Sequence, residues 1–259
     1  MLRHRPPPAR LRSALTLGLG ALAGCAGGPG HAPHAQPTAA SHAASRVAQR
    51  RVVVIGRSVL GRAIRAVVIG AQPTSRAVLV IGCVHGDETA GEAVTRALRR
   101  AAPPRSSALW LIDALNPDGC RARTRQNAHG VDLNRNAPWH WRPLDARGGT
   151  FWSGPRAASE PETQTILRLV RRLRPAVTVW FHQHASLVDD SGADRGIERR
   201  YARRVGLPFP HYGTFPGSLT SWQDATFPRD TAFVVELPPG RMSAAAVRRH
   251  AQAVLALAG

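Results

Sequence analysis

The sequence predicts a single α/β domain in which helices flank both faces of a mixed, mostly parallel β-sheet. The chain has 259 residues, 43% of them hydrophobic, which is enough to bury a sizeable core. From residue 51 onward, short runs rich in β-branched residues alternate with longer runs of helical periodicity. Several polar clusters come directly after an apolar run, as is typical of strand ends in open α/β sheets.

Three strands are expected before the first helix. Residues 51–55 and 66–69 are β-branched runs, and the segment 56–65 can join them as a hairpin. Residues 77–82 read Ala-Val-Leu-Val-Ile-Gly, a continuous apolar run of the kind that a parallel sheet buries on both faces. Residues 91–100 then show the periodicity of a helix.

The rest of the chain repeats this alternation. Strands are expected at 109–115, 177–181 and 231–237, and helices at 160–173 and 243–257. Strands separated by helices need crossover connections, which are right-handed and favour parallel pairing. A single domain over 49–259 therefore accounts for all of these elements.

The N-terminal segment is typical of a bacterial lipoprotein signal. Residues 1–12 carry four arginines and no acid, and a short run built mainly of Leu, Ala and Gly follows. The run ends in Leu-Ala-Gly-Cys at Cys25, which resembles the lipobox where a signal peptidase cuts and the cysteine is lipidated. We expect a signal peptide over 1–24, a lipidated Cys25 opening a flexible tether over 25–48, and an extracytoplasmic protein anchored to the bacterial cell membrane.

The charge is strongly positive, with 35 basic and 16 acidic residues and a formal net charge of +19. Every basic residue is arginine, and the chain is also rich in Ala and Pro. Such a composition is typical of a GC-rich genome, so the charge alone does not indicate a polyanionic partner. We expect no nucleic-acid partner.

Two cysteines lie outside the N-terminal segment. In an oxidising compartment Cys83 and Cys120 can form a disulfide, whereas in the absence of proximity they stay free thiols. The spacing does not decide between the two states.

A metal site is predicted after two of the strands. His85 and Glu88 follow the strand at 77–82, and Gly86 between them allows the bend that turns both onto one ion. His182 follows the strand at 177–181, and two imidazoles with one carboxylate form an open three-ligand zinc site. His184 is the alternative ligand, because residues two apart in an extended segment share a face. We favour His182, which lies closer to the strand end.

These residues belong to a series of motifs that resembles the zinc metallocarboxypeptidase family. The motifs are H-G-D-E, N-P-D-G, T-R-Q-N, G-V-D-L-N-R-N and V-E-L-P-P-G, and they begin at residues 85, 116, 124, 130 and 235. They occur in the order of that family, over roughly residues 78–240. The chain is most similar to the short bacterial branch that contains murein-tripeptide amidases. The resemblance implies a metallocarboxypeptidase-like fold and one Zn²⁺ ion per chain.

The resemblance also implies roles for the metal site and its base. His85, Glu88 and His182 match the zinc ligands of the family. Glu236 in V-E-L-P-P-G matches the catalytic glutamate, a general base and acid that acts on zinc-bound water.

Three further residues match the substrate-binding groups of the family. Arg125 matches the arginine that polarises the scissile carbonyl, and a guanidinium near the ion suits a developing oxyanion. Asn134 and Arg135 match the pair that binds the terminal carboxylate, which a planar guanidinium can hold with two hydrogen bonds. Asp118 and Asp132, in the same motifs, are interpreted as bracing turns and loops.

Two departures bear on the substrate. Asp87 stands where digestive members of the family carry an arginine that binds extended peptides, which argues against long substrates. The mobile tyrosine of the family has only an approximate match in Tyr212. Upstream of Glu236, Asp224 or Asp230 is predicted to meet the side-chain ammonium of a diaminopimelate-like residue.

The predicted function is that of a zinc metallocarboxypeptidase or peptide amidase, and of a monomer. It would cleave the C-terminal residue from a short, cell-wall-derived peptide of the murein type. Two alternatives stay open. One is a zinc deacylase of N-acyl amino acids, which shares the H-G-x-E and D-L-N-R segments. The other is a non-catalytic binding lipoprotein of the cell envelope.

Overall fold

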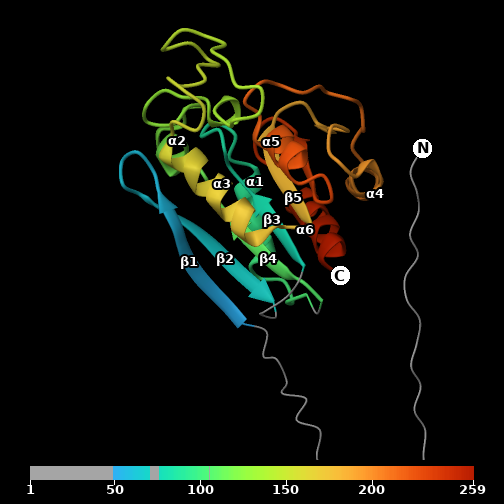
Figure 1. Ribbon diagram of the computed structural model, residues 1–259. Coiled ribbons are helices and arrows are strands. Elements are labelled where there is room, and N and C mark those ends of the chain that lie inside the picture. The colour runs from blue at the N-terminus through green and yellow to red at the C-terminus, as the bar shows by residue number, and fades with distance from the viewer. Residues whose placement is uncertain (1–48, 71–75, 105) are drawn as a thin grey trace, which may run out of the picture. The chain divides into compact units, whose positions relative to one another are not determined.

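The computed structural model describes residues 49–70, 76–104 and 106–259 and contains one mixed sheet with the strand order β1-β2-β4-β3-β5-β7-β6 (Figure 1). The strands are β1 (Gln49–Arg57), β2 (Ala63–Gly70), β3 (Ala77–Ile81), β4 (Ala108–Ile112), β5 (Val177–Gln183), β6 (Leu187–Val188) and β7 (Thr231–Leu237). The central strands β4, β3, β5 and β7 pair in parallel. The hairpin β1–β2 and the short strand β6 join this core antiparallel. The expectation of a mixed, mostly parallel sheet is confirmed.

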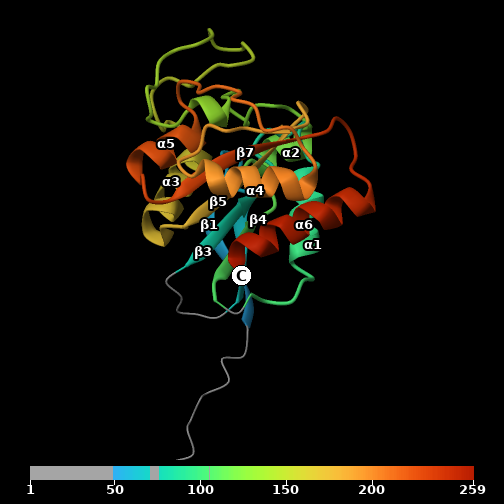
Figure 2. The same ribbon diagram turned by 90° about the vertical axis from the view of Figure 1, so that its right-hand side faces the viewer.

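Helices cover both faces of this sheet. They are α1 (Gly91–Leu98), α2 (Pro117–Ala122), α3 (Pro161–Leu173), α4 (Arg195–Val205), α5 (Leu219–Thr226) and α6 (Ala244–Ala258), with a short 3₁₀ turn η1 (Leu133–Arg135). One apolar cluster packs α1, α4 and α6 on a face of the sheet, and a second packs α3 and α5 on the other. In Figure 2, α4 and α6 lie in front of the sheet. Both faces of the sheet carry an apolar cluster because side chains alternate between the faces along each strand. Val80 thus lies in the first cluster and Leu79 in the second.

The nine expected elements all form, with shifts at their ends. The strand expected at 109–115 ends at Ile112, and the strand expected at 177–181 continues to Gln183. The sequence did not lead us to expect α2, α4, α5, β6 or η1. Helix α4 is the longest of these, and its signals were present: Asp194 caps its first turn through two backbone N–H groups, and Gly206 ends it in the left-handed conformation. Its run of arginines and low hydrophobicity masked them.

The disulfide that the spacing left undecided is present between Cys83 and Cys120. It joins the loop after β3 to helix α2. The predicted signal peptide, the lipidated Cys25 and the tether lie outside the described residues. Among the residues that are described, no helix is long and apolar enough to span a bilayer.

One buried and one half-buried carboxyl group lie near the start of β7. Glu198 of α4 accepts a hydrogen bond from the Thr231 hydroxyl at 3.1 Å, and Asp224 of α5 accepts one from the Ala232 backbone N–H at 2.8 Å. Burial is the main cause that raises the pKa of Glu198 to about 7 and the pKa of Asp224 to about 8. Each group therefore keeps its proton in the folded chain over a pH range in which the unfolded chain has lost it.

This pair predicts a loss of thermal stability between pH 5.5 and pH 8.5. A raised folded-state pKa gives stability that is fully present below the unfolded pKa and is lost as the pH rises through the folded pKa, here about 7 to 8. Asp224→Asn removes one of the two ionisations, so its Tm falls less over this interval than that of the wild type. Circular dichroism melts at both pH values measure the difference. Glu92→Gln, at the surface ion pair with Arg96, is the control and keeps the full decrease. An equal decrease in Asp224→Asn and the wild type would contradict the prediction.

Candidate active site

The predicted metal ligands lie at the ends of the neighbouring strands β3 and β5, where the order in which the chain adds strands to the sheet reverses. From β3 the chain first adds β4 on one side and later β5 on the other, so a crevice opens between the carboxyl ends of β3 and β5. His85 and Glu88 lie in the loop after β3, and His182 lies within β5. Gly86 is required in this loop because a Cβ there would lie 1.9 Å from the carbonyl carbon of Gly119.

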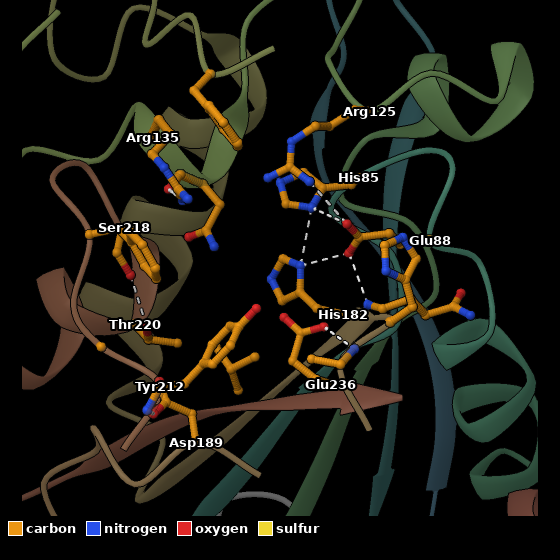
Figure 3. A pocket seen from close by; sticks show the side chains of 18 of the residues that line it. His85, Glu88, Arg125, Arg135, His182, Asp189, Tyr212, Ser218, Thr220 and Glu236 are labelled. Atoms are coloured by element: carbon orange, nitrogen blue, oxygen red, sulfur yellow. Dashed lines mark hydrogen bonds and ion pairs between the residues drawn. The ribbon is translucent and has the colours of Figure 1, made fainter. Parts of the chain in front are cut away.

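The three side chains converge closely enough to share one ion (Figure 3). His85 Nδ1 lies 2.9 Å from Glu88 Oε1, and His182 Nδ1 lies 2.9 Å from Glu88 Oε2. The two Nδ1 atoms lie 3.2 Å apart. Two nitrogens that bind one zinc ion at about 2.0–2.1 Å with tetrahedral angles are roughly 3.3–3.4 Å apart. Both the spacing and the two-imidazole, one-carboxylate donor set therefore fit zinc.

Asp132 supports this group from behind. It is fully buried, and its Oδ1 lies 3.0 Å from Nε2 of His85, the ring nitrogen that faces away from the other ligands. Burial alone lowers the pKa of His85, but Asp132 and Glu88 outweigh it and raise that pKa to about 9. Burial also opposes ionisation of Glu88, yet the two imidazoles hold its pKa far below the usual range. The pocket thus attracts positive charge.

Arg125 is held at the edge of the metal group by the same aspartate. Its Nε and Nη2 donate to Asp132 Oδ2 at 3.0 and 2.9 Å, and its Nη1 donates to Glu88 Oε1 at 3.0 Å. The ring of Phe151 lies 5.4 Å from the guanidinium carbon. Arg125 is therefore placed where it can donate to an oxygen atom that approaches the ion.

Asn134 and Arg135 form another wall of the cavity, in the turn that Asp132 begins. Asp132 Oδ1 accepts from the Asn134 backbone N–H at 2.9 Å, and Asn134 Oδ1 accepts from the Leu219 backbone N–H at 3.0 Å. Arg135 is 8% exposed, donates to the Asn134 carbonyl at 2.8 Å and packs on the ring of Phe215. It forms no ion pair with a carboxylate of the described residues, so its guanidinium is available to an anion.

Glu236 enters the same cavity from β7. In the parallel register of β5 and β7 it lies opposite His182, which places it beside the metal group. Its Oε2 accepts a weak hydrogen bond, 3.5 Å long, from the Ala185 backbone N–H. Tyr212 points its hydroxyl toward Glu236 and His182 (Figure 3), so the approximate match by spacing leads to a residue of the site.

One cavity of about 360 Å³ contains these groups. Of the predicted site residues it is lined by His85, Glu88, Arg125, Asn134, Arg135, His182 and Glu236. His184 also lines it, but this residue is exposed and is not part of the converging group. Asp118 does brace a turn, because its carboxylate accepts from the Leu60 backbone N–H and pairs with Arg62.

The prediction for Asp224 needs correction. Asp224 does not line the cavity; it accepts from Ala232 near the start of β7, whereas Glu236 lies near the end of that strand. The other candidate, Asp230, pairs with Arg174 at the surface. Both acids precede Glu236 in sequence, but the length of β7 separates them from the site.

Asp189 is a buried acid that lines the cavity and that the sequence did not reveal. It follows β6, a two-residue strand that pairs with β7 beside Glu236, and it is 3% exposed. Asp132 was predicted only to brace a loop, but it also contacts His85 and Arg125. The signal for Asp132 was its place in the motif with Asn134 and Arg135. For Asp189, only its position after an apolar pair, Leu-Val, hinted at a strand end.

The fold and the converging side chains define a class of protein, the α/β metallohydrolases with a two-histidine, one-carboxylate site. A family model described as zinc carboxypeptidase matches residues 39–189, more than half of the chain. The chain belongs to the zinc carboxypeptidase family, and zinc is the cofactor that this membership implies.

Several curated relatives are named murein peptide amidase A. The chain is 32% identical over 158 residues to murein peptide amidase A of Escherichia coli K12, which covers 56% of this chain and 64% of the relative. It is 31% identical over 218 residues to the protein of the same name from Vibrio campbellii, which covers 78% of this chain and 85% of the relative. The match thus spans less than two thirds of the Escherichia coli protein and most of the Vibrio protein.

Solved structures are also similar to this chain. The murein-tripeptide amidase MpaA from Escherichia coli O157 superposes with a TM-score of 0.67 and 30% identity, over 83% of this chain and 94% of that chain. Carboxypeptidase A from Helicoverpa armigera superposes with a TM-score of 0.65 and 19% identity, over 81% and 69%. The second likeness concerns the fold alone. It confirms the predicted metallocarboxypeptidase-like fold.

The position of Asp132 predicts that it controls zinc affinity without binding zinc. Asp132→Asn removes the charge that orients His85 and Arg125, so we expect the Kd for zinc to rise by about 10- to 100-fold. Competition with a chromophoric chelator measures it, and circular dichroism checks the fold. Asp87→Asn is the matched control, because Asp87 is exposed and makes no hydrogen bond to the three ligands. Equal zinc affinity in Asp132→Asn and Asp87→Asn would refute this role.

Proposed function

We propose that this protein is a zinc-dependent hydrolase that removes the C-terminal residue from a short peptide of the murein type, ending in a diaminopimelate-like residue. One observation carries the proposal: a single cavity brings together a metal group, an anion-binding pair and two groups for catalysis. These are His85, Glu88 and His182; Asn134 and Arg135; and Arg125 and Glu236. The names of the relatives, murein peptide amidases, support the substrate class.

The substrate is bound through its terminal carboxylate. The Arg135 guanidinium can donate two parallel hydrogen bonds to it, and burial of Arg135 strengthens this pairing. Asn134 uses its carbonyl oxygen for Leu219, which leaves its amide nitrogen for the same carboxylate. Because Asn134 and Arg135 are consecutive in one turn, the two donors are held in a fixed geometry.

The peptide bond to be cleaved then lies between Arg125 and Glu236. Zinc, when bound, supplies a Lewis acid that polarises a carbonyl oxygen and makes water acidic. Arg125 donates to the carbonyl oxygen as negative charge develops on it. Glu236 takes the proton of the attacking water and passes it to the leaving amine as the C–N bond breaks. Asp132 keeps Arg125 in place throughout.

Asp189 gives the cavity its selectivity for a side chain that carries an ammonium group. Its Oδ1 accepts from the Tyr212 backbone N–H at 2.8 Å, and its Oδ2 accepts from the Ser191 hydroxyl at 2.6 Å. Each oxygen keeps a further lone pair, and Asp189 forms no ion pair with any described residue. In Figure 3, Arg135 lies at the top of the view and Asp189 at the bottom. The carboxylate of one substrate residue can therefore bind Arg135 while its ammonium group binds Asp189.

The remaining features fit a short substrate outside the cytoplasm. Asp87 lies at the rim of the cavity, at the position where an arginine would bind an extended peptide. As part of the proposal, the chain is a monomer that Cys25 and its lipid anchor to the bacterial cell membrane, where cell-wall peptides are found.

The function is tested with the zinc-loaded full chain on three substrates: a tripeptide ending in diaminopimelate, a longer peptide with the same end, and an N-acyl amino acid. We expect one zinc per chain and the highest kcat/KM for the tripeptide. Glu236→Gln should lower kcat by about 10²- to 10⁴-fold with the zinc content unchanged, because it removes only proton transfer. Preference for the N-acyl amino acid would identify a deacylase, and absence of zinc a binding protein.

The role of Asp189 predicts a change in selectivity. Asp189→Asn keeps the size of the side chain and removes its charge, so kcat/KM should fall about tenfold or more for the diaminopimelate-ended peptide. The value for a peptide with a neutral C-terminal residue should change little. Asp224→Asn is the control for the corrected assignment and should leave the ratio of the two values unchanged. If Asp189→Asn also leaves that ratio unchanged, Asp189 does not read the ammonium group.

A further inference from the structure

A second groove of about 360 Å³ continues from the active-site cavity. The two share Asp87, Gln183 and His184 in their walls. Asp87 precedes the metal ligand Glu88 in sequence, and Gln183 follows the ligand His182. The groove therefore begins beside the metal group, at residues next in sequence to two of the ligands.

This groove lies where the acyl part of a bound substrate must leave the site. Arg135 and Phe215 line the active-site cavity and are absent from the walls of the groove. If the terminal carboxylate lies at Arg135 and the cleaved bond at the metal group, the chain on the other side of that bond points away from Arg135. The shared walls beside Glu88 and His182 are the exit in that direction.

Three of the residues that line the groove are arginines. Arg96, Arg123 and Arg241 all line it. Arg96 is already paired with Glu92 at 2.7 Å. Arg123 and Arg241 are exposed, and neither forms an ion pair with a carboxylate of the described part of the chain. The groove thus offers two unneutralised guanidinium groups to a ligand.

Arg123 is firmly attached to the site. It ends helix α2 in the left-handed conformation, with its backbone N–H bonded to the Gly119 carbonyl. The disulfide of Cys120 ties the same helix to the loop that carries His85. Arg123 also lines another hollow together with Asp87 and Gly86. The position of its backbone relative to the loop that carries His85 is therefore well defined.

We propose that this groove is an anion subsite in which Arg123 and Arg241 bind a free carboxylate on the acyl part of the substrate. The inference rests on the proposed function, and it adds the chemistry that is recognised beyond the cleaved bond. Guanidinium groups bind carboxylates in two-point geometry, which suits a planar acid group that is fixed in a short peptide. Asp87 lines both the active-site cavity and the groove, so its charge repels a carboxylate held close to it and favours one held nearer to the arginines.

The test compares two peptides that end in diaminopimelate and differ at one acidic residue on the acyl side, which carries either a free carboxylate or its carboxamide. For the wild type we expect kcat/KM to be about 5- to 30-fold higher for the carboxylate, as two exposed ion pairs allow. The double variant Arg123→Ala/Arg241→Ala should lose this preference, because its kcat/KM falls mainly for the carboxylate. Salt at 0.5 M should weaken the preference of the wild type.

The control is Arg65→Ala/Arg203→Ala, which removes the same charge at exposed positions outside the groove. It should retain the preference. A binding measurement separates the subsite from catalysis. The probe is the part of the peptide that precedes the cleaved bond, with the free carboxylate on its acidic residue. Measured by calorimetry, it should bind the wild type more tightly than the double variant. Equal Kd values, or equal preference in both proteins, would overturn the subsite. Failure of the zinc-loaded chain to cleave either peptide would overturn the proposed function, and the calorimetric comparison would still decide on the subsite.

Discussion

The contact of Asp132 with both His85 and Arg125 is the interaction on which the site depends. One buried carboxylate bonds His85 through one oxygen and Arg125 through the other, and its Oδ1 also begins the turn that carries Asn134 and Arg135. Removing a charge from water is costly unless it is paired and hydrogen-bonded, and here every oxygen has partners. His85, Arg125 and the turn that carries Asn134 and Arg135 are thereby held by a single side chain.

The loops around the cavity are rigid for a related reason. Asn127 bonds Glu160 and Glu162 at the start of α3, and it accepts the backbone N–H groups of His129 and Val131. The loop from Thr124 to Asn136 has little regular structure of its own, so buried side-chain bonds replace the ladder of a helix or strand. Such a loop can carry several substrate-binding groups without moving them when the substrate enters.

The distribution of charge in the cavity matches the proposed substrate. Arg135 lies on one wall and Asp189 on another, with the metal group and Glu236 between them. A residue that carries both a carboxylate and a distant ammonium is complementary to this arrangement, whereas a residue with an apolar side chain leaves Asp189 without a partner. An unpaired buried charge is costly, so in the proposed function Asp189 would both attract one kind of substrate and disfavour others. The total charge of the chain, by contrast, carries no such information.

Local periodicity and motifs a few residues long were enough to predict the fold class, nine of the elements, and the residues of the metal group. His85 and Glu88 are three residues apart, and His182 comes directly after an apolar run that predicts a strand. The folded arrangement was needed to show that Asp189 and not Asp224 faces the cavity, that Asp132 supports His85, and that Cys83 meets Cys120. These contacts join segments whose distance in sequence says nothing about their distance in space: which end of a strand a side chain occupies, and which strand lies beside it, are set by the packing of the whole sheet.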